Sequence, residues 1–160
     1  MQKERKGKLV GKVVILALAG AIIVGTVIGV VGIMEVKNTY LNMVKEELHV
    51  ACVQADSEFS SVWDGDWGYE DANLTKGEEE VYEEYVEIME ENKKLTDLEY
   101  TIFYGNTRAA TTLKDASGNY LVGTTASDAV VNEVITQGQD SYKQNLDIGG
   151  KKYYGYYTPL

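Results

Sequence analysis

The apolar and polar positions divide the chain into one long uncharged stretch and a patterned remainder. Val13–Met34 carries no charge over 22 residues, and about 20 apolar residues are enough for a helix to cross the hydrocarbon core of a membrane. The stretch therefore predicts a transmembrane helix. Ala17-Leu18-Ala19 matches the small-x-small pattern of a signal-peptide cleavage site. The apolar run before it is too short for a signal peptide, so we expect the helix to be retained.

The apolar spacing continues beyond this span. No Gly or Pro interrupts residues 33–64, so the helix can extend outward as a stalk. Apolar residues recur at intervals of three and four and form a stripe made by Leu41, Val44, Leu48, Ala51, Ala55, Phe59 and Val62. The stripe predicts a packing seam, which meets either a second copy of the chain or the domain's own sheet.

Small residues form a ridge within the predicted span. Ala17, Ala21, Gly25 and Gly29 recur every fourth residue, and ridges of this kind allow two helices to approach closely in a bilayer. The ridge favours a homodimer formed through the transmembrane and stalk helices.

The remaining segments predict a loop, a second helix and a run of strands. Residues 64–78 are rich in turn-forming residues and predict a loop. Residues 78–95 predict a helix, because Val81, Tyr85, Ile88 and Met89 lie on one face and most glutamates lie on the other.

Beyond Thr96 the pattern becomes β. Residues 98–105, 107–115 and 120–126 are strand-like, and residues 141–148 and 151–160 form a hairpin around Gly149-Gly150. A short helix over 127–138, with Ser127 as N-cap and Gly138 as its stop, separates the two groups. The order predicts an α+β domain with an antiparallel sheet on a long N-terminal helix.

The distribution of charge predicts the orientation of the chain in the membrane and argues against a nucleic-acid partner. Five basic residues and one acid precede the span, so the positive-inside rule places residues 1–12 in the cytoplasm, 13–34 in the membrane and 35–160 outside. The exported part holds 10 of the 15 basic and 24 of the 25 acidic residues, a formal charge of −14. Such a field opposes phosphate binding, so no nucleic-acid partner is expected.

Arg108 is the first candidate site residue. It and Arg5 are the only arginines of the chain, and its planar guanidinium suits a carboxylate. Strict strand alternation would place Ala110 and Thr112 on the same face, where their small side chains leave space for a ligand. Arg108 and Thr112 are therefore candidate ligand contacts.

A structural role for the arginine is the alternative. The guanidinium could instead pair with a domain acid such as Glu99 or Asp115, and the two roles look the same in a sequence.

Aromatic residues supply the other candidates. Tyr154 and Tyr156 share one strand face, and Tyr153 and Tyr157 share the other. One pair packs on a helix, while the other lines a cleft and donates O–H groups; Tyr154 and Tyr156 are the pair assigned to the ligand. Trp67 is a further aromatic candidate for the ligand, with a surface anchor as the alternative.

Other chemistry finds little support. Asp64-Gly65-Asp66 suggests a calcium loop, but the required alternating oxygens fail at Gly68, so no metal site is predicted. No nucleophile motif or phosphate-binding loop occurs, so we expect neither an enzyme nor a cofactor. Cys52 is the only cysteine; it is either a small apolar residue or a cross-link between two copies.

Five segments in order resemble the single Cache sensor domain of bacterial methyl-accepting chemotaxis proteins. They are GDW at 65–67, TIFYGNTRAATTL at 101–113, GNYLVGTTAS at 118–127, VITQGQDSY at 134–142 and IGGKKYYGYYTPL at 148–160. The resemblance implies a PAS-like ligand-sensing domain outside the inner membrane. It also implies that TR-x-x-T belongs to the pocket and that a loop near Trp67 caps it. The expected ligand is a small molecule with a carboxylate, or an amino acid.

The resemblance also implies a longer protein. After Tyr-x-Pro-Leu the family continues with one more strand, a second transmembrane helix and signalling regions. We therefore expect an N-terminal fragment of a receptor whose sheet lacks its last strand, which lies between the first strand and the final hairpin. Histidine kinases and diguanylate cyclases carry Cache domains too and remain alternatives. A pilin-like subunit is disfavoured, because pilins need a processing site before the span and a Glu early within it.

Overall fold

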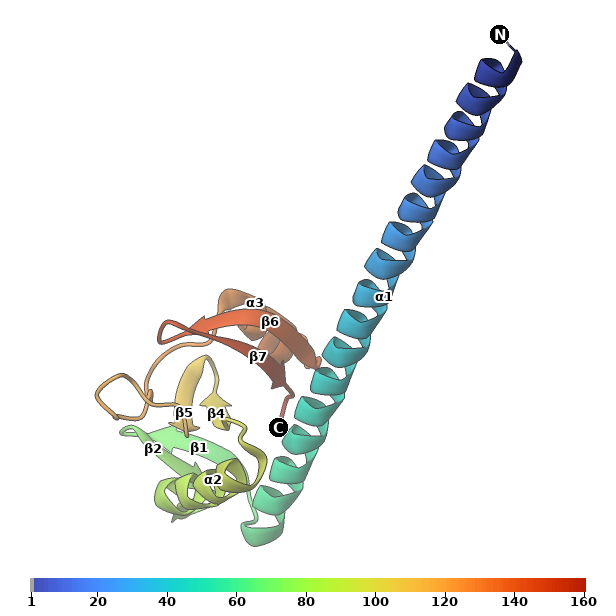
Figure 1. Ribbon diagram of the computed structural model, residues 1–160. Coiled ribbons are helices and arrows are strands. Elements are labelled where there is room, and N and C mark those ends of the chain that lie inside the picture. The colour runs from blue at the N-terminus through green and yellow to red at the C-terminus, as the bar shows by residue number, and fades with distance from the viewer. Residues whose placement is uncertain (1) are drawn as a thin grey trace. The chain divides into compact units, whose positions relative to one another are not determined.

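The computed structural model describes residues 2–160, apart from the side chains of residues 2–4, 9 and 10. Met1, which begins the predicted basic N-terminus, lies outside the described residues. The chain forms two compact units, one ending at Val44 and the other running from Lys45 to Leu160. Helix α1 (Gln2–Val62) makes up the first unit and begins the second (Figure 1).

The first unit contains the segment predicted to cross a membrane. Every residue from Gly11 to Tyr40 is exposed, and α1 is the one helix in the described part of the chain that is long and apolar enough to cross a bilayer. All its backbone groups can bond within the helix, as a lipid environment requires. The unit is consistent with a single-pass membrane anchor.

The second unit is an α+β domain with three small antiparallel sheets. The first sheet holds β1 (Trp67–Glu70), β2 (Asn73–Lys76) and β3 (Glu79–Glu80), the second β4 (Thr101–Tyr104) and β5 (Thr107–Thr111), and the third β6 (Ser141–Ile148) and β7 (Lys151–Tyr157). Helix α2 (Tyr82–Thr96) follows β3, and α3 (Asp128–Val130) continues into the π-helix η1 (Val131–Thr136) before β6. The predicted fold class is confirmed.

The seam of the stalk helix packs against the domain itself. Ala51, Ala55 and Phe59 are buried, and Phe59 meets Tyr85 of α2 with ring centroids 4.6 Å apart. Val62, the last predicted member of the stripe, is 53% exposed. Of the two alternatives, the domain's own core therefore covers the seam over residues 51–59.

Residues 64–78 were expected to form a loop, and this prediction is wrong. They contain the β1–β2 hairpin, whose two-residue turn is Asp71-Ala72 with φ of 50° and 66°. Positive φ at both positions is typical of a type I′ turn, which normally carries glycine or asparagine. The hairpin is held by Trp67, whose ring lies 5.1 Å from that of the fully buried Tyr85.

Helix α2 begins at Tyr82, later than predicted, because Glu79 and Glu80 pair with β2 as a short strand. Its apolar face is confirmed, since Tyr85 and Met89 are fully buried. The helix ends at Thr96, and its C-cap residue Asp97 has a left-handed conformation with φ of 59°.

The strand predicted over 120–126 is wrong, because only two isolated bridges form there, Lys114↔Tyr120 and Thr107↔Thr125. The helix prediction for 127–138 is confirmed: Ser127 is the N-cap of α3, and Gly138 ends the helical segment with φ of 64°. The β6–β7 hairpin also turns as predicted, with positive φ at both glycines of Gly149-Gly150.

Strands β4 and β7 each use one edge only. Within residues 2–160, β4 pairs with β5 and β7 pairs with β6, and no described strand joins the two pairs. A free strand edge carries backbone donors and acceptors that can bond an added strand. Both strands therefore have one edge that could pair with a further strand.

Candidate functional site

Arg108 is the one charged residue among those that the structure describes as buried, with 6% of its surface exposed. Its backbone N–H donates to the Thr124 carbonyl at 2.8 Å, and its carbonyl accepts from Gly123 N–H at 2.9 Å. The side chain points the same way, since Nη1 donates to Thr124 Oγ1 and, at 3.5 Å, to the Leu121 carbonyl. The loop after β5 thus wraps the arginine and removes it from bulk water.

A β-bulge decides which residues share a face with Arg108. The β4–β5 register pairs Ile102 with Ala110 and Phe103 with Arg108, so Ala109 is an extra residue on β5. Ile102 and Ala110 belong to the hydrophobic core cluster. Ala110 therefore faces the core, opposite to Arg108.

The same bulge brings Thr111 to the face of Arg108. The hydroxyls of Thr101 and Thr111 are 2.7 Å apart, and the guanidinium carbon of Arg108 lies 5.2 Å from the centroid of the Phe103 ring. Thr101 and Phe103 are two residues apart on β4 and share a face. The prediction that Ala110 and Thr112 accompany Arg108 is wrong, because strict alternation does not allow for a bulge.

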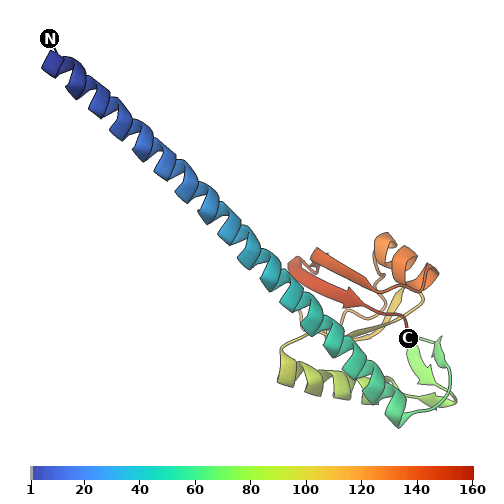
Figure 2. The same ribbon diagram turned by 90° about the vertical axis from the view of Figure 1, so that its right-hand side faces the viewer.

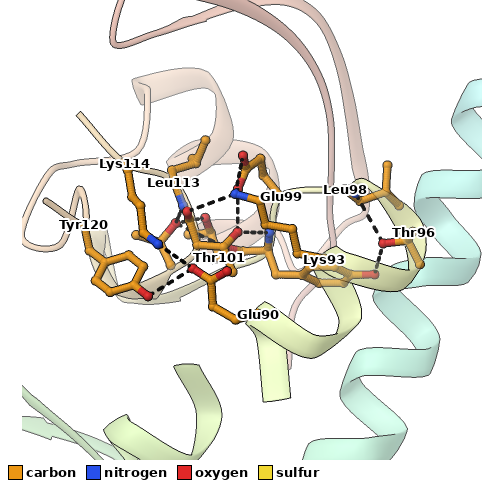
Figure 3. A network of polar contacts seen from close by, with 12 residues as sticks. Glu90, Lys93, Thr96, Leu98, Glu99, Thr101, Leu113, Lys114 and Tyr120 are labelled. Atoms are coloured by element: carbon orange, nitrogen blue, oxygen red, sulfur yellow. Dashed lines mark hydrogen bonds and ion pairs between the residues drawn. The ribbon is translucent and has the colours of Figure 1, made fainter. Parts of the chain in front are cut away.

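Neither of the acids considered as a structural partner reaches Arg108. Glu99 accepts hydrogen bonds from Lys93 at 2.9 Å and from Thr112 at 2.6 Å, and Figure 3 shows it beside Lys93. Asp115 accepts the amides of its own turn. No ion pair in the described residues includes Arg108, and its Nε has no hydrogen-bond partner there. The structural ion-pair interpretation is therefore not supported.

Figure 3 also shows the hydrogen bonds that anchor the loop covering Arg108 to α2. Glu90 of α2 accepts hydrogen bonds from Lys114 Nζ at 2.9 Å and from the Tyr120 hydroxyl at 3.0 Å. These bonds hold the pKa of Glu90 below its ordinary value. The loop is fixed to α2 immediately before Leu121, the first residue whose carbonyl reaches the guanidinium.

Burial acts on the charge itself. It lowers the pKa of Arg108 below its ordinary value, while the nearby Tyr157 has a smaller opposite effect. An arginine stays protonated at neutral pH even so. The domain consequently holds a desolvated positive charge with a free N–H donor, a combination that favours an anion.

A cavity of about 480 Å³ lies beside Arg108, and it is lined by the consecutive residues Thr101–Gly105 and Tyr153–Leu160. A cavity over one face of a strand is lined by alternate residues, because successive side chains point to opposite faces. A cavity along the edge of a strand is lined by consecutive residues. The cavity therefore follows the free edges of β4 and β7. Residues of α1, among them Ala55 and Phe59, also line the cavity, and its Arg108–Phe103 end is where a buried charged donor is found.

Four of the five predicted ligand residues line this cavity, namely Arg108, Trp67, Tyr154 and Tyr156. Thr112 does not: it is fully buried and its hydroxyl donates to Glu99. Trp67 is fixed against Tyr85, and the Lys76 ammonium lies 4.2 Å from the centroid of its ring. Tyr154 is 40% exposed and stacks on Tyr142.

Tyr156 is directed at α1 rather than at Arg108. Its ring centroid lies 5.0 Å from that of His49, and its hydroxyl donates to Asp140 at 2.8 Å. The Cys52 thiol donates to the Tyr156 carbonyl at 3.6 Å. Figures 1 and 2 both place the end of β7 beside the part of α1 that follows Lys45. Tyr156 thus attaches β7 to α1.

The Asp64-Gly65-Asp66 turn has a backbone role. Gly77 N–H donates to the Asp66 carbonyl at 2.9 Å, and a Cβ on Gly65 would lie only 2.7 Å from Gly77 Cα. In the described part of the chain, no group of three or more His, Cys, Asp or Glu side chains is placed to hold a metal ion.

Phe103 and Tyr157 belong to the site but were not among the predicted contacts. A two-residue turn at Gly105-Asn106 places Phe103 opposite Arg108. The contact between these two residues could therefore have been predicted from the hairpin register. The contacts of Thr124 and Tyr157 with this region join segments distant in the chain, and no local pattern indicates them.

Comparison with known proteins gives one match. The family described as single cache domain 3 matches residues 80–160, which include α2, both later sheets and Arg108. No curated protein and no solved structure matches the chain.

Proposed function

Because the chain belongs to the single Cache domain 3 family, we propose that it is the ligand-sensing part of a bacterial membrane chemoreceptor of the methyl-accepting type. Cache domains are extracellular modules that bind small molecules. In this proposal residues 1–12 are cytoplasmic, residues 13–34 cross the inner membrane and residues 35–160 form the sensor outside. A sensor histidine kinase or diguanylate cyclase is the alternative, and the output domain of the full-length protein distinguishes them.

The observation that carries the ligand assignment is that the guanidinium of Arg108 is buried and has no ion-pair partner among the described residues. A buried charge is stable when it is paired, and a planar donor fork matches a carboxylate. No acid of the described chain pairs with it. We therefore assign it a carboxylate ligand, either a simple monocarboxylate or an amino acid.

The charge of the domain narrows this class further. Residues 35–160 carry a formal charge of −14, which repels multiply charged anions. A ligand with one negative charge, or a zwitterion, meets the least repulsion on its way to Arg108. Binding transmits a signal if the ligand has different affinities for two states of the protein that differ in the packing of a helix pair.

The chain is proposed to act as a homodimer. The ridge of Ala17, Ala21, Gly25 and Gly29 lies on α1 within the first unit, and small residues at this spacing favour close helix pairs in a membrane. Crosslinking of single-cysteine variants along α1 tests this arrangement.

A thermal-shift screen of the full chain in detergent tests the ligand class. The panel holds acetate, propanoate, butanoate, hexanoate, alanine and leucine, with butanamide as an uncharged control. We expect at least one carboxylate to raise Tm and butanamide to leave it unchanged. Arg108→Met should remove the response, whereas Arg5→Met, which changes the only other arginine, should keep it. A full response in Arg108→Met would reject the assignment.

A further inference from the structure

The last residue of β7 lies beside Arg108. The rings of Tyr157 and Phe103 have centroids 6.3 Å apart, and the same Phe103 ring lies 5.2 Å from the Arg108 guanidinium carbon. All three residues line the cavity. Two aromatic rings and a guanidinium from three different strands thus gather at one end of it.

The Tyr157 hydroxyl lies close to Gly155 of the same strand. A Cβ on Gly155 would lie 2.6 Å from Leu146 Cδ1, 3.2 Å from Tyr157 Cε2 and 3.3 Å from the Tyr157 hydroxyl oxygen. The phenol therefore leans back along its own strand and lies over Gly155, on the strand face that these two residues share. A side chain at 155 would occupy that place.

The other two β7 tyrosines that were assigned to the ligand have different surroundings. The Tyr156 hydroxyl already donates to Asp140 at 2.8 Å. Tyr154 stacks on Tyr142 with 40% of its surface exposed. Tyr157, in contrast, packs against Phe103, the ring that also contacts the buried guanidinium of Arg108.

The chemistry of the phenol suits a donor. Burial raises the pKa of Tyr157 above its ordinary value, and Arg108 only partly opposes this. The hydroxyl is therefore protonated at neutral pH and can donate one hydrogen bond. A carboxylate has two oxygens, so it can accept from the guanidinium and from a phenol together.

We propose that Tyr157 is a second ligand-contacting residue, whose hydroxyl donates to the carboxylate held by Arg108. This inference rests on the proposed function. It replaces Tyr154 and Tyr156 as the tyrosine contacts.

Calorimetric titration of the full chain in detergent with acetate, propanoate, butanoate and hexanoate tests the proposal. A hydrogen bond to a charged group contributes about 1.5–3 kcal/mol, so Tyr157→Phe should raise Kd by about 10-fold or more. Its Tm without ligand should stay close to the wild-type value, because the ring is retained. Tyr154→Phe, on the other face of the same strand, is the matched control and should leave Kd unchanged.

The outcomes separate the two proposals. If the wild type binds a carboxylate and loses it in Arg108→Met, but Tyr157→Phe binds with wild-type affinity, the role of Tyr157 is rejected and the proposed function stands. If the wild type binds neither these four carboxylates nor alanine or leucine, both are rejected.

Discussion

Replacing Arg108 by methionine separates a structural role of the guanidinium from a ligand-binding role. Methionine is unbranched and flexible, so it can fill much of the same path without a charge. If Arg108 were half of a buried ion pair, removing it would leave an uncompensated acid. Such a change costs roughly 3–5 kcal/mol of the free energy of unfolding.

The contacts of Arg108 predict a much smaller effect. Its Nε donor has no partner among the described residues, and an unsatisfied buried donor costs about 1–3 kcal/mol that the variant regains. The variant loses the bond from Nη1 to Thr124, which contributes about 1.5–3 kcal/mol as a bond to a charged group. Thr124 keeps its own donation to the Leu121 carbonyl at 2.9 Å. The two effects nearly cancel, so we expect a change of less than about 1.5 kcal/mol.

Urea unfolding of the full chain in detergent, followed by tryptophan fluorescence, measures this difference. Both tryptophans, Trp63 and Trp67, pack against the core cluster and report its loss. The midpoint should move little and the slope should stay the same. A loss above about 3 kcal/mol would refute the reasoning, because it would indicate a structural pair for Arg108.

Further predictions concern the turn, the buried phenol and the thiol. Ala72→Gly should stabilise the domain by about 0.5–1 kcal/mol, because Ala72 has φ of 66° in the β1–β2 turn and glycine adopts this conformation without strain; a lower urea midpoint would contradict this. Burial raises the pKa of Tyr85 from 10.0 to about 12, so its contribution is complete below pH 10 and is lost as pH rises from 10 to 12. Urea unfolding at pH 9 to 11.5 should show a fall of about 1.5–2 kcal/mol from this group, and a profile just as steep in Tyr85→Phe would rule out this residue as the cause. Burial, with a smaller effect of Asp140, raises the pKa of Cys52 to about 11, so its thiolate population at pH 7.5 is about 100-fold below that of a free thiol. Reaction with an aromatic disulfide reagent should be slower by about that factor in the native chain than in urea, and equal rates would contradict the burial of Cys52.

Local patterns predicted the elements whose geometry depends on neighbouring residues. Tyr85 and Met89 are four residues apart and share the buried face of α2, as helical spacing requires. Gly149-Gly150 has the positive φ values that a tight hairpin needs. In both cases the residue types and the structure agree within a few positions of the chain.

The failures share a physical cause. Asp71 and Ala72 adopt positive φ although neither is a glycine. The residue types of the β1–β2 turn therefore do not predict its conformation. The bulge at Ala109 arises from the pairing of β5 with β4 and reverses the face of Thr112 relative to Arg108. Neither feature follows from propensity, because each depends on contacts made by the folded domain.

The candidate site was predictable only in part for the same reason. Arg108 stood out by composition, since the chain has two arginines. Its neighbours Phe103, Thr124 and Tyr157 come from separate segments that the fold brings together. The strand face on which a tyrosine of β7 lies could be assigned from alternation, but not which face meets the arginine.

Nuclear magnetic resonance of the full chain with ¹⁵N-labelled arginine tests the central claim most directly. The chain should give two Nε–H signals, from the exposed Arg5 and the buried Arg108. On titration with the monocarboxylate that calorimetry shows to bind, the account predicts that the Arg108 signal shifts with the same Kd while the Arg5 signal stays in place. A ligand that binds while the Arg108 Nε–H signal remains unmoved would contradict it.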